Sequence, residues 1–364
     1  MKYWWGYLVA GIVAACSWGL AKFSETHGAL VDMIYPYVTR IVQSYLAGWS
    51  SGVEFCVWQV LVLVLLVLTL ASIVLMIVLK WNAIQWGGWV LAVLCAVNFA
   101  NTAAYGLNHY SSTLAVDMQL ENAEYRYTIG ELEAAAIFYR DRANELADQV
   151  RRDEKGDVAI QEIDQLSQLA GEGFDVLTYE RFQPVFAGSR LPIKELDWAK
   201  AFTKRGVTGI TVPLTGESAI NPQTPAVMQP YVVCREMAKR MCIATEQDAN
   251  FAAFLACDAN SAAEFRYAAY LMAYRYCHAV LASVAGASQQ LNMQSLENGV
   301  NANMQHDLDA CEKFFNGHEK IDESVCDLLV VWHIQEYVLP LLQEEEEEPF
   351  DPFDESVVDL TGLV

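Results

Sequence analysis

The first 106 residues contain three long runs of apolar side chains separated by shorter polar segments. The runs cover residues 3–21, 57–79 and 86–106, and a helix needs about 20 apolar residues to cross the hydrocarbon core of a bilayer. Aromatic residues begin the first and third runs, and Lys22 and Lys80 follow the first and second, as is typical of a membrane interface. The pattern predicts three transmembrane helices.

The first run also has a feature of a secretory signal. Residues 13–16 read Val-Ala-Ala-Cys, which resembles a bacterial lipoprotein cleavage site. However, the apolar run continues beyond Cys16 to Leu20, and a single basic residue, Lys2, precedes it. We therefore expect an uncleaved helix.

The segment between the first two runs, residues 23–52, is amphipathic. Its apolar residues recur at helical spacing on both sides of Pro36. This spacing predicts short helices that rest on the bilayer surface or on the following domain.

Helical periodicity predominates after residue 107. We expect helices near residues 128–152, 158–170, 248–258, 262–285, 307–315 and 322–342, and another that begins at Pro230. Proline and glycine interrupt residues 184–230, where residues 209–212 form a possible short strand. The unbroken row of glutamates at 344–348 predicts a solvated tail. The chain thus divides into a membrane region (1–107), a mainly α-helical domain (108–342) and an acidic tail (343–364).

The formal net charge of −22 lies almost wholly in the domain and the tail. Four basic and three acidic residues precede residue 107, which leaves 19 basic and 42 acidic residues after it. Such a region repels nucleic acid and anionic lipid headgroups, so no nucleic-acid partner is expected, although solubility alone also explains the charge. The nine cysteines include no Cys-x-x-Cys pair and are not expected to form a disulfide framework.

Residues 234–239 read Cys-Arg-Glu-Met-Ala-Lys, the outline of a His-Glu-x-x-His zinc-protease helix in which cations replace both histidines. In the zinc motif, imidazoles at positions i and i+4 bind the metal and the glutamate activates the bound water. Arg235 and Lys239 hold these two positions, and their charged forms offer no lone pair to a metal. Only Glu236 is retained.

Five motifs occur in order along the chain: Gly-Leu-Asn-His-Tyr at 106–110, Pro-Leu-Thr-Gly-Glu-Ser-Ala-Ile-Asn at 213–221, the 234–239 helix, Asp-Ala-Asn-Phe at 248–251 and Arg-Tyr-Ala-Ala-Tyr-Leu at 266–271. Together they resemble an uncharacterised family of bacterial three-span membrane proteins, domain of unknown function 3810. The resemblance covers most of the chain and implies a zincin-like fold for the domain.

In that family the helix reads His-Glu-Leu-Ala-His, and an acidic residue before Ala-Asn-Phe is the third ligand. The resemblance therefore implies ligand positions at Arg235, Lys239 and Asp248 and a general base at Glu236. Two of the three ligands are lost, so we expect no tightly bound zinc, no other cofactor and no catalytic residue.

Arg235 and Lys239 would restore two positive charges where the metal would have been. We expect them to form ion pairs with Glu236 and Asp248 in a partly buried cluster, since unpaired buried ions cost several kcal/mol, of the order of 3–5 when one partner is removed. The alternative is a solvent-exposed helix with ordinary surface charges.

The function expected from the resemblance is non-catalytic binding of a peptide or membrane-protein partner in the former substrate cleft, with Glu217, Asn221 and Asn250 at its wall. An active hydrolase with a remodelled site and a structural scaffold are the alternatives. Three spans that start from a cytoplasmic N-terminus would make a multi-pass protein of the cell membrane with its domain outside the cell. The positive-inside pattern is divided, because Lys2 and Lys80 would face in and Lys22 and Arg40 out.

Overall fold

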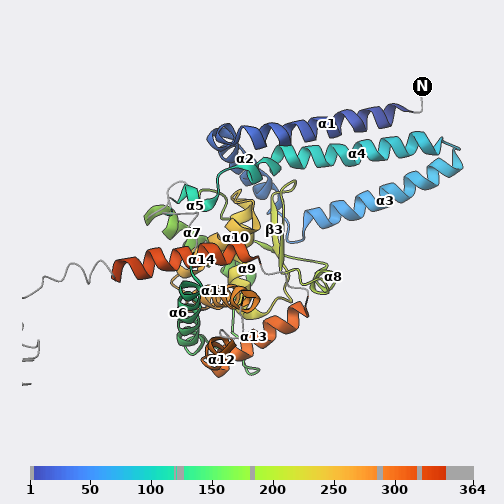
Figure 1. Cartoon of the computed structure of the whole chain (residues 1–364). Coiled ribbons are helices and arrows are strands. Elements are labelled where there is room, and N and C mark those ends of the chain that lie inside the picture. Colours follow the sequence, from blue (N-terminus) through green and yellow to red (C-terminus); the bar gives the residue numbers. More distant parts are fainter. Residues whose placement is uncertain are drawn as a thin grey trace, which may run out of the picture.

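Three long helices project together from one side of a helical domain in the computed structural model (Figure 1). The structure describes residues 4–118, 120, 127–180, 185–284, 290–317 and 322–341, so the predicted acidic tail lies outside the described residues. The three helices are α1 (Trp5–Thr26), α3 (Val57–Val78) and α4 (Ala83–Ala104), and each is long and apolar enough to cross a membrane. The three predicted spans are thus confirmed as helices of suitable length and composition, with α1 extending five residues beyond its predicted end at residue 21.

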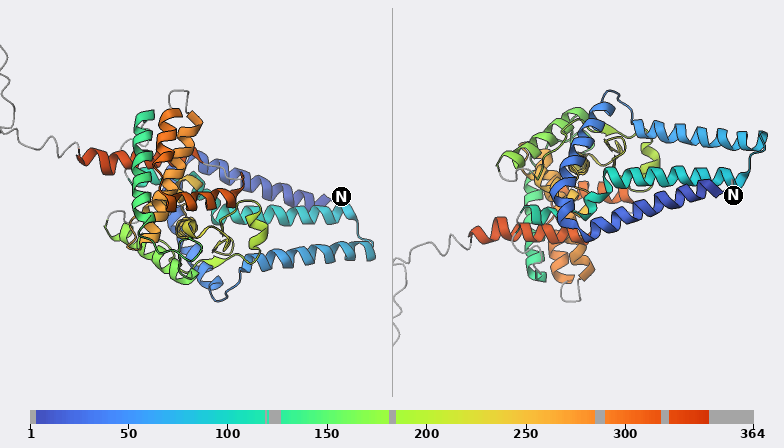
Figure 2. Two further views of the ribbon diagram at one scale, coloured as in Figure 1. Left: turned by 90° about the horizontal axis from the view of Figure 1, so that it is seen from below. Right: turned by 90° about the horizontal axis from the view of Figure 1, so that it is seen from above.

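Helices α1 and α4 lie side by side, whereas α3 stands apart from them (Figure 2). Gly6 and Gly88 allow this close approach, because a Cβ on Gly6 would come within 2.4 Å of the Gly88 carbonyl carbon. One hydrogen bond joins α3 to α4, from the Trp86 indole nitrogen to the Ser72 hydroxyl at 3.1 Å. Apolar side chains on most sides of α3 are exposed, as suits a helix surrounded by lipid.

Helix α2 (Gly28–Ser50) runs across the base of the three long helices (Figure 2). The prediction of several short helices was wrong, because Pro36 lies inside this single helix. Proline removes one helical hydrogen bond, but contacts to the domain hold the helix on both sides of it. Before the proline, Asp32 accepts a hydrogen bond from the backbone N–H of Ser112. Arg40 donates to the Met241 carbonyl oxygen and Gln43 to that of Pro213, each at 3.0 Å. The opposite face of α2 exposes large apolar side chains, including Ile41, Tyr45 and Trp49.

The domain consists of helices with a small sheet at one side, which packs against α9 (Figure 1). The helices are α5 (Leu114–Asp117), α6 (Ile129–Ala147), α7 (Ile163–Glu180), α8 (Ala199–Thr203), α9 (Gln229–Arg240), α10 (Glu246–Asp258), α11 (Ala263–Val284), α12 (Gln290–Asn298), α13 (Ala302–Phe315) and α14 (Glu323–His333), with short helical segments η2 (Gly106–Tyr110), η3 (Ala226–Met228) and η4 (Ile334–Val338). The strands are β1 (Lys194–Glu195), β2 (Gly209–Val212) and β3 (Glu217–Ile220). Their order is β1-β3-β2, with β1 parallel and β2 antiparallel to β3. The strand predicted at 209–212 is confirmed.

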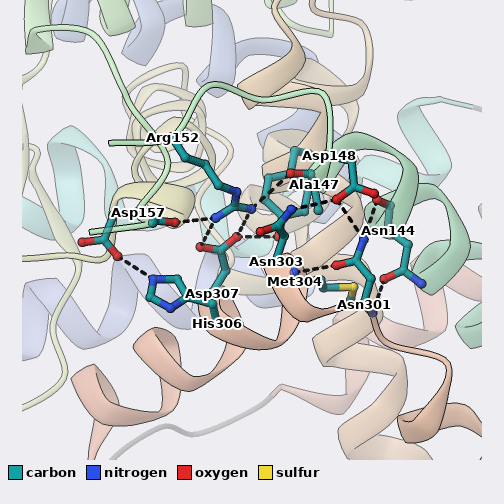
Figure 3. A network of polar contacts seen from close by, with 12 residues as sticks. Asn144, Ala147, Asp148, Arg152, Asp157, Asn301, Asn303, Met304, His306 and Asp307 are labelled. Atoms are coloured by element: carbon teal, nitrogen blue, oxygen red, sulfur yellow. Dashed lines mark hydrogen bonds and ion pairs between the residues drawn. The ribbon is translucent and has the colours of Figure 1, made fainter. Parts of the chain in front are cut away.

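One hydrophobic core joins α6, α7, α9, α10, α11 and α14. At its edge, a buried ion pair fixes the loop after α6 to α13 (Figure 3). The two terminal nitrogens of Arg152 donate to the two carboxylate oxygens of Asp307 at 3.2 and 2.8 Å, and the Tyr267 hydroxyl donates to the same carboxylate at 2.6 Å. Because both terminal nitrogens of Arg152 and both oxygens of Asp307 have partners inside the fold, the network stabilises the domain.

Candidate functional site: a buried ion cluster on α9

Helix α9 carries the motif residues and packs against β2 and β3. Pro230 lies in its first turn, where the missing N–H costs no helical hydrogen bond. The later turns of α9 face the sheet and the start of α10, and they carry Arg235, Glu236 and Lys239. We call these three residues, together with Glu246 of α10, the ion cluster.

Glu236 is at the centre of the ion cluster and is 0% exposed. Its Oε1 accepts hydrogen bonds from Nη2 of Arg235 at 2.7 Å and from Nε at 3.0 Å, and it lies 3.6 Å from Nζ of Lys239. Its Oε2 accepts from the Thr211 hydroxyl of β2 at 2.9 Å. Both carboxylate oxygens are therefore occupied by partners within the chain.

The cations have further partners that fix them in place. Arg235 also donates to the Thr208 hydroxyl at 2.9 Å. Lys239 donates to a carboxylate oxygen of Glu246 at 2.6 Å, and the Tyr105 hydroxyl, at the end of α4, donates to the Lys239 backbone oxygen at 2.8 Å. Two basic and two acidic groups thus make a cluster with no formal net charge, which extends from the buried Glu236 to Glu246, whose side chain is 63% exposed.

Electrostatics keep Glu236 ionised. Burial by itself raises a carboxyl pKa, but the charges of Arg235 and Lys239 and the hydrogen bonds to the carboxylate outweigh it, so the pKa of Glu236 lies below its usual value. The same attraction overcomes burial at Arg235 and raises its pKa. The pair therefore stays charged across the whole neutral range.

Asp248 does not join this cluster, which corrects the expected pairing. Within the described residues it forms no ion pair; its Oδ2 accepts from the hydroxyl of Thr245, the N-cap of α10, at 2.8 Å, and its backbone N–H donates to that same hydroxyl at 3.0 Å. Thr-x-x-Asp is a helix-capping pattern, so the sequence contained a local signal that competed with the metal-site interpretation. Glu246, two residues earlier, supplies the second carboxylate instead.

The three residues predicted to line a cleft are buried. Glu217 accepts from the backbone N–H groups of Val57 and Trp58 at the start of α3. The Asn221 side chain donates to the Thr203 hydroxyl and the Val207 carbonyl. Asn250 donates to the backbone oxygen of Glu246, one turn back in α10. Glu217 and Asn221 thus join separate segments of the fold, whereas Asn250 bonds within its own helix.

The comparisons with known proteins place the chain in a family. The sequence profile of the family described as "Protein of unknown function (DUF3810)" matches residues 31–330. The chain belongs to this family. No curated protein and no solved structure matches it. In this DUF3810 protein the matched residues run from α2 to α14 and include the whole ion cluster.

The sequence of this DUF3810 protein predicted three of the four residues of the ion cluster. It did not predict Glu246, nor the two threonines, Thr208 and Thr211, that bond to the cluster. The threonines come from β2 and the residue before it, and only the pairing of β2 with β3 brings them against α9. Among the described residues, no group of three or more His, Cys, Asp or Glu side chains is placed to hold a metal ion.

Gly209 leaves the space that the Glu236 carboxylate occupies. A Cβ at this position would come within 2.8 Å of Cγ and 3.0 Å of Oε1 of Glu236. We expect Gly209→Ala to lower the free energy of unfolding by about 2 kcal/mol, as overpacking typically does. Gly130→Ala in α6 is the matched control, because the nearest atom to its Cβ is 3.8 Å away. Equal stabilities of the two variants in urea unfolding would show that the carboxylate is not confined by β2.

Proposed function

We propose that this DUF3810 protein is a membrane-anchored, zincin-like protein that binds a peptide or membrane-protein partner without catalysing a reaction. The observation that carries the proposal is the state of Glu236, which is fully buried and holds Arg235, Lys239 and Thr211 on its two oxygens. A general base must reach a water or a substrate proton and be free to accept it. Glu236 is not exposed to water, and both of its oxygens already have partners within the chain.

The zincin-like origin of the domain is part of this proposal. It is supported by the order of residues 235, 236 and 239 on one helix and by the acidic Glu246, which lies within 2.6 Å of the second cation. In an ancestral site with histidines at 235 and 239, a carboxylate in this place would complete a three-ligand zinc site. The two cations supply the charge that the metal carried, so the fold of the site is kept while its chemistry is lost.

A partner would meet the cluster at its surface end, where Glu246 is exposed and Lys239 is partly so. Glu217, Asn221 and Asn250, which were predicted at the wall of a cleft, are buried, so the proposed surface contact is with Glu246 and Lys239. An active hydrolase with a remodelled site and a structural scaffold remain the competing functions.

Peptide binding and turnover separate the three functions. The purified full-length chain in detergent is incubated with a library of unmodified peptides, with and without added zinc, and both bound and cleaved peptides are identified by mass spectrometry. We expect peptides to be recovered intact from the protein, with a yield that a zinc chelator does not change. Cleavage that the chelator abolishes would show that the protein is a hydrolase. If peptides are neither bound nor cleaved, the structural scaffold is the function that fits.

We further propose that the domain lies on the outer side of the cell membrane, as three spans after a cytoplasmic N-terminus imply. Lys155 lies in an exposed turn after α6 and is a suitable site for a single added cysteine. A membrane-impermeant maleimide should label Lys155→Cys in intact cells. If the maleimide labels Lys155→Cys only after the cells are broken, the domain lies on the inner side of the membrane instead.

A further inference from the structure

The two faces of α2 differ in polarity along the whole helix. Its two charged residues are Asp32 and Arg40, and both are half-buried. Asp32 accepts a hydrogen bond from the segment before α5, and Arg40 and Gln43 donate to backbone oxygens of the domain. The exposed face of α2, every residue of which the structure describes, therefore carries no charged side chain.

Nine large apolar side chains make up this exposed face, which we call the apolar strip. They recur with the period of one helical face and are 37% to 79% exposed. The strip includes Leu30, Ile34, Ile41, Tyr45 and Trp49. Contiguous apolar surface of this extent is rare on a water-facing protein and marks a place that a partner or a membrane covers.

The connections of α2 place the apolar strip at the level of the span ends. His27 alone separates α1 from α2, and residues 51–56 separate α2 from α3. Figure 2 shows α2 crossing the base of the three long helices. A helix that is joined to a span at each end and lies across both of them runs along the membrane surface.

Exposed aromatic side chains gather at both ends of the three spans. At the end far from the domain they are Trp4, Trp5, Trp81 and Trp89. At the domain end they are Phe23, Tyr37, Tyr45, Trp49 and Phe55, three of them on α2. The 22 residues of α3 between these ends are about 33 Å long, close to the thickness of the hydrocarbon core. Because tryptophan and tyrosine concentrate at the two membrane–water interfaces, the aromatic residues of α2 belong to the interface on the domain's side.

We propose that α2 lies in the plane of the membrane, with the apolar strip inserted into the boundary between headgroups and acyl chains on the domain's side. Lipid is favoured over a second copy of the chain, because the strip continues through Phe23 and Phe55 into helices that are long and apolar enough to cross a membrane. Since the strip is uncharged, the contact is with acyl chains and needs no anionic headgroups, which the acidic domain would repel. This inference does not rest on the proposed function and holds for either orientation of the domain.

The domain holds α2 firmly, so the helix acts as a mount for it. Gly216 lies against the backbone of α2, where a Cβ would come within 2.5 Å of the Ala47 nitrogen. Arg40 bonds the carbonyl oxygen of Met241, the residue that follows α9. The depth of α2 in the membrane therefore sets the distance of the ion cluster from the bilayer.

The depth of a spin label on the apolar strip tests the proposal. In the full-length chain, Tyr45 is replaced by p-acetylphenylalanine, whose ketone takes a nitroxide without involving the nine cysteines. Tyr179 in α7, 76% exposed against 79% for Tyr45, is the matched control in water, and Leu65 in the middle of α3 is the control in lipid. Power saturation is measured in phosphatidylcholine nanodiscs with oxygen, which concentrates in lipid, and with a nickel chelate, which stays in water.

We expect the ratio of oxygen to nickel accessibility at residue 45 to be several-fold higher than at residue 179 and to approach the ratio at residue 65. Equal ratios at residues 45 and 179 would show that the strip faces water and would overturn the proposal. Dipolar broadening of the residue 45 spectrum that disappears on dilution with unlabelled chain would assign the strip to a second copy and would overturn it too.

A charge on the apolar strip should draw α2 out of the bilayer. Ile41→Asp is expected to lower the accessibility ratio at residue 45 towards that at residue 179, because a carboxylate is expelled from the acyl region. Ile137→Asp, at an exposed position of α6, is the matched control and should leave the ratio unchanged. Neither isoleucine is buried, so neither change removes core packing. An unchanged ratio in Ile41→Asp would contradict the insertion of the strip.

Discussion

Arg235→Ala is expected to lower the free energy of unfolding by about 4 kcal/mol, because it leaves the fully buried carboxylate of Glu236 without its closest counter-ion. Lys239 remains 3.6 Å from that carboxylate but is already bonded to Glu246, so it compensates only in part. Urea unfolding of the full-length chain in detergent, followed by tryptophan fluorescence, measures the change.

Two controls separate a buried pair from ordinary surface charge. Arg205→Ala removes an exposed arginine and should change the stability by less than about 0.5 kcal/mol. The double variant Arg235→Met with Glu236→Gln removes both charges and should be more stable than Arg235→Ala, because no unpaired ion is left. If Arg235→Ala behaves as Arg205→Ala does, the cluster does not stabilise the domain.

Glu217→Ala is expected to cost about 3–4 kcal/mol and to loosen the attachment of α3 to the domain. One carboxylate oxygen accepts from the Val57 N–H at 2.8 Å and from Nζ of Lys194 at 2.7 Å, and the other accepts from the Trp58 N–H at 2.9 Å. The carboxylate thus satisfies two unpaired amides at the N-terminus of α3 and the charge of a lysine whose side chain is 10% exposed. Its loss leaves the two amides without an acceptor and Lys194 without its counter-ion, although Nζ of Lys194 keeps its hydrogen bonds to the backbone oxygens of Ser50 and Phe55.

Hydrogen–deuterium exchange locates this effect. In Glu217→Ala, amides of residues 56–60 and 194–196 should exchange faster, while those of α11 should change little. Glu195→Ala, which removes an exposed carboxylate from the neighbouring strand β1, is the control. Exchange that increases uniformly in both variants would show that Glu217 has no special role at the α3 junction.

Local signals in the sequence predicted several elements correctly. The apolar runs predicted α1, α3 and α4, the pattern of proline and glycine left residues 209–212 as the possible strand that is β2, and Pro230 marked the start of α9. These predictions succeed because each depends on residues that are neighbours in the chain. α7 was predicted too early, at 158–170, since the apolar residues before Ile163 belong to an extended segment that packs on the core.

The site depended on contacts between distant residues and was predicted only in part. The pairing of Arg235 with its neighbour Glu236 follows from their adjacency, but the roles of Thr211 and Glu246 follow from the position of β2 and α10 beside α9. Glu217 was assigned to a cleft because nothing in its own segment shows that the start of α3 lies against β3. Tertiary packing, and not local preference, decides the partner of each of these charges.

The zinc content of the purified protein tests most directly whether ion pairs have taken the place of a metal in the ion cluster. Wild-type protein and the variant Arg235→His with Lys239→His are dialysed against micromolar zinc and then against zinc-free buffer, and elemental analysis gives the zinc bound per chain. We predict substoichiometric zinc in the wild type and about one zinc per chain in the double variant, whose two imidazoles and Glu246 carboxylate make three ligands. The variant should also be more stable with zinc than with a chelator. About one zinc per wild-type chain, or a double variant that neither binds zinc nor gains stability from it, would contradict the account.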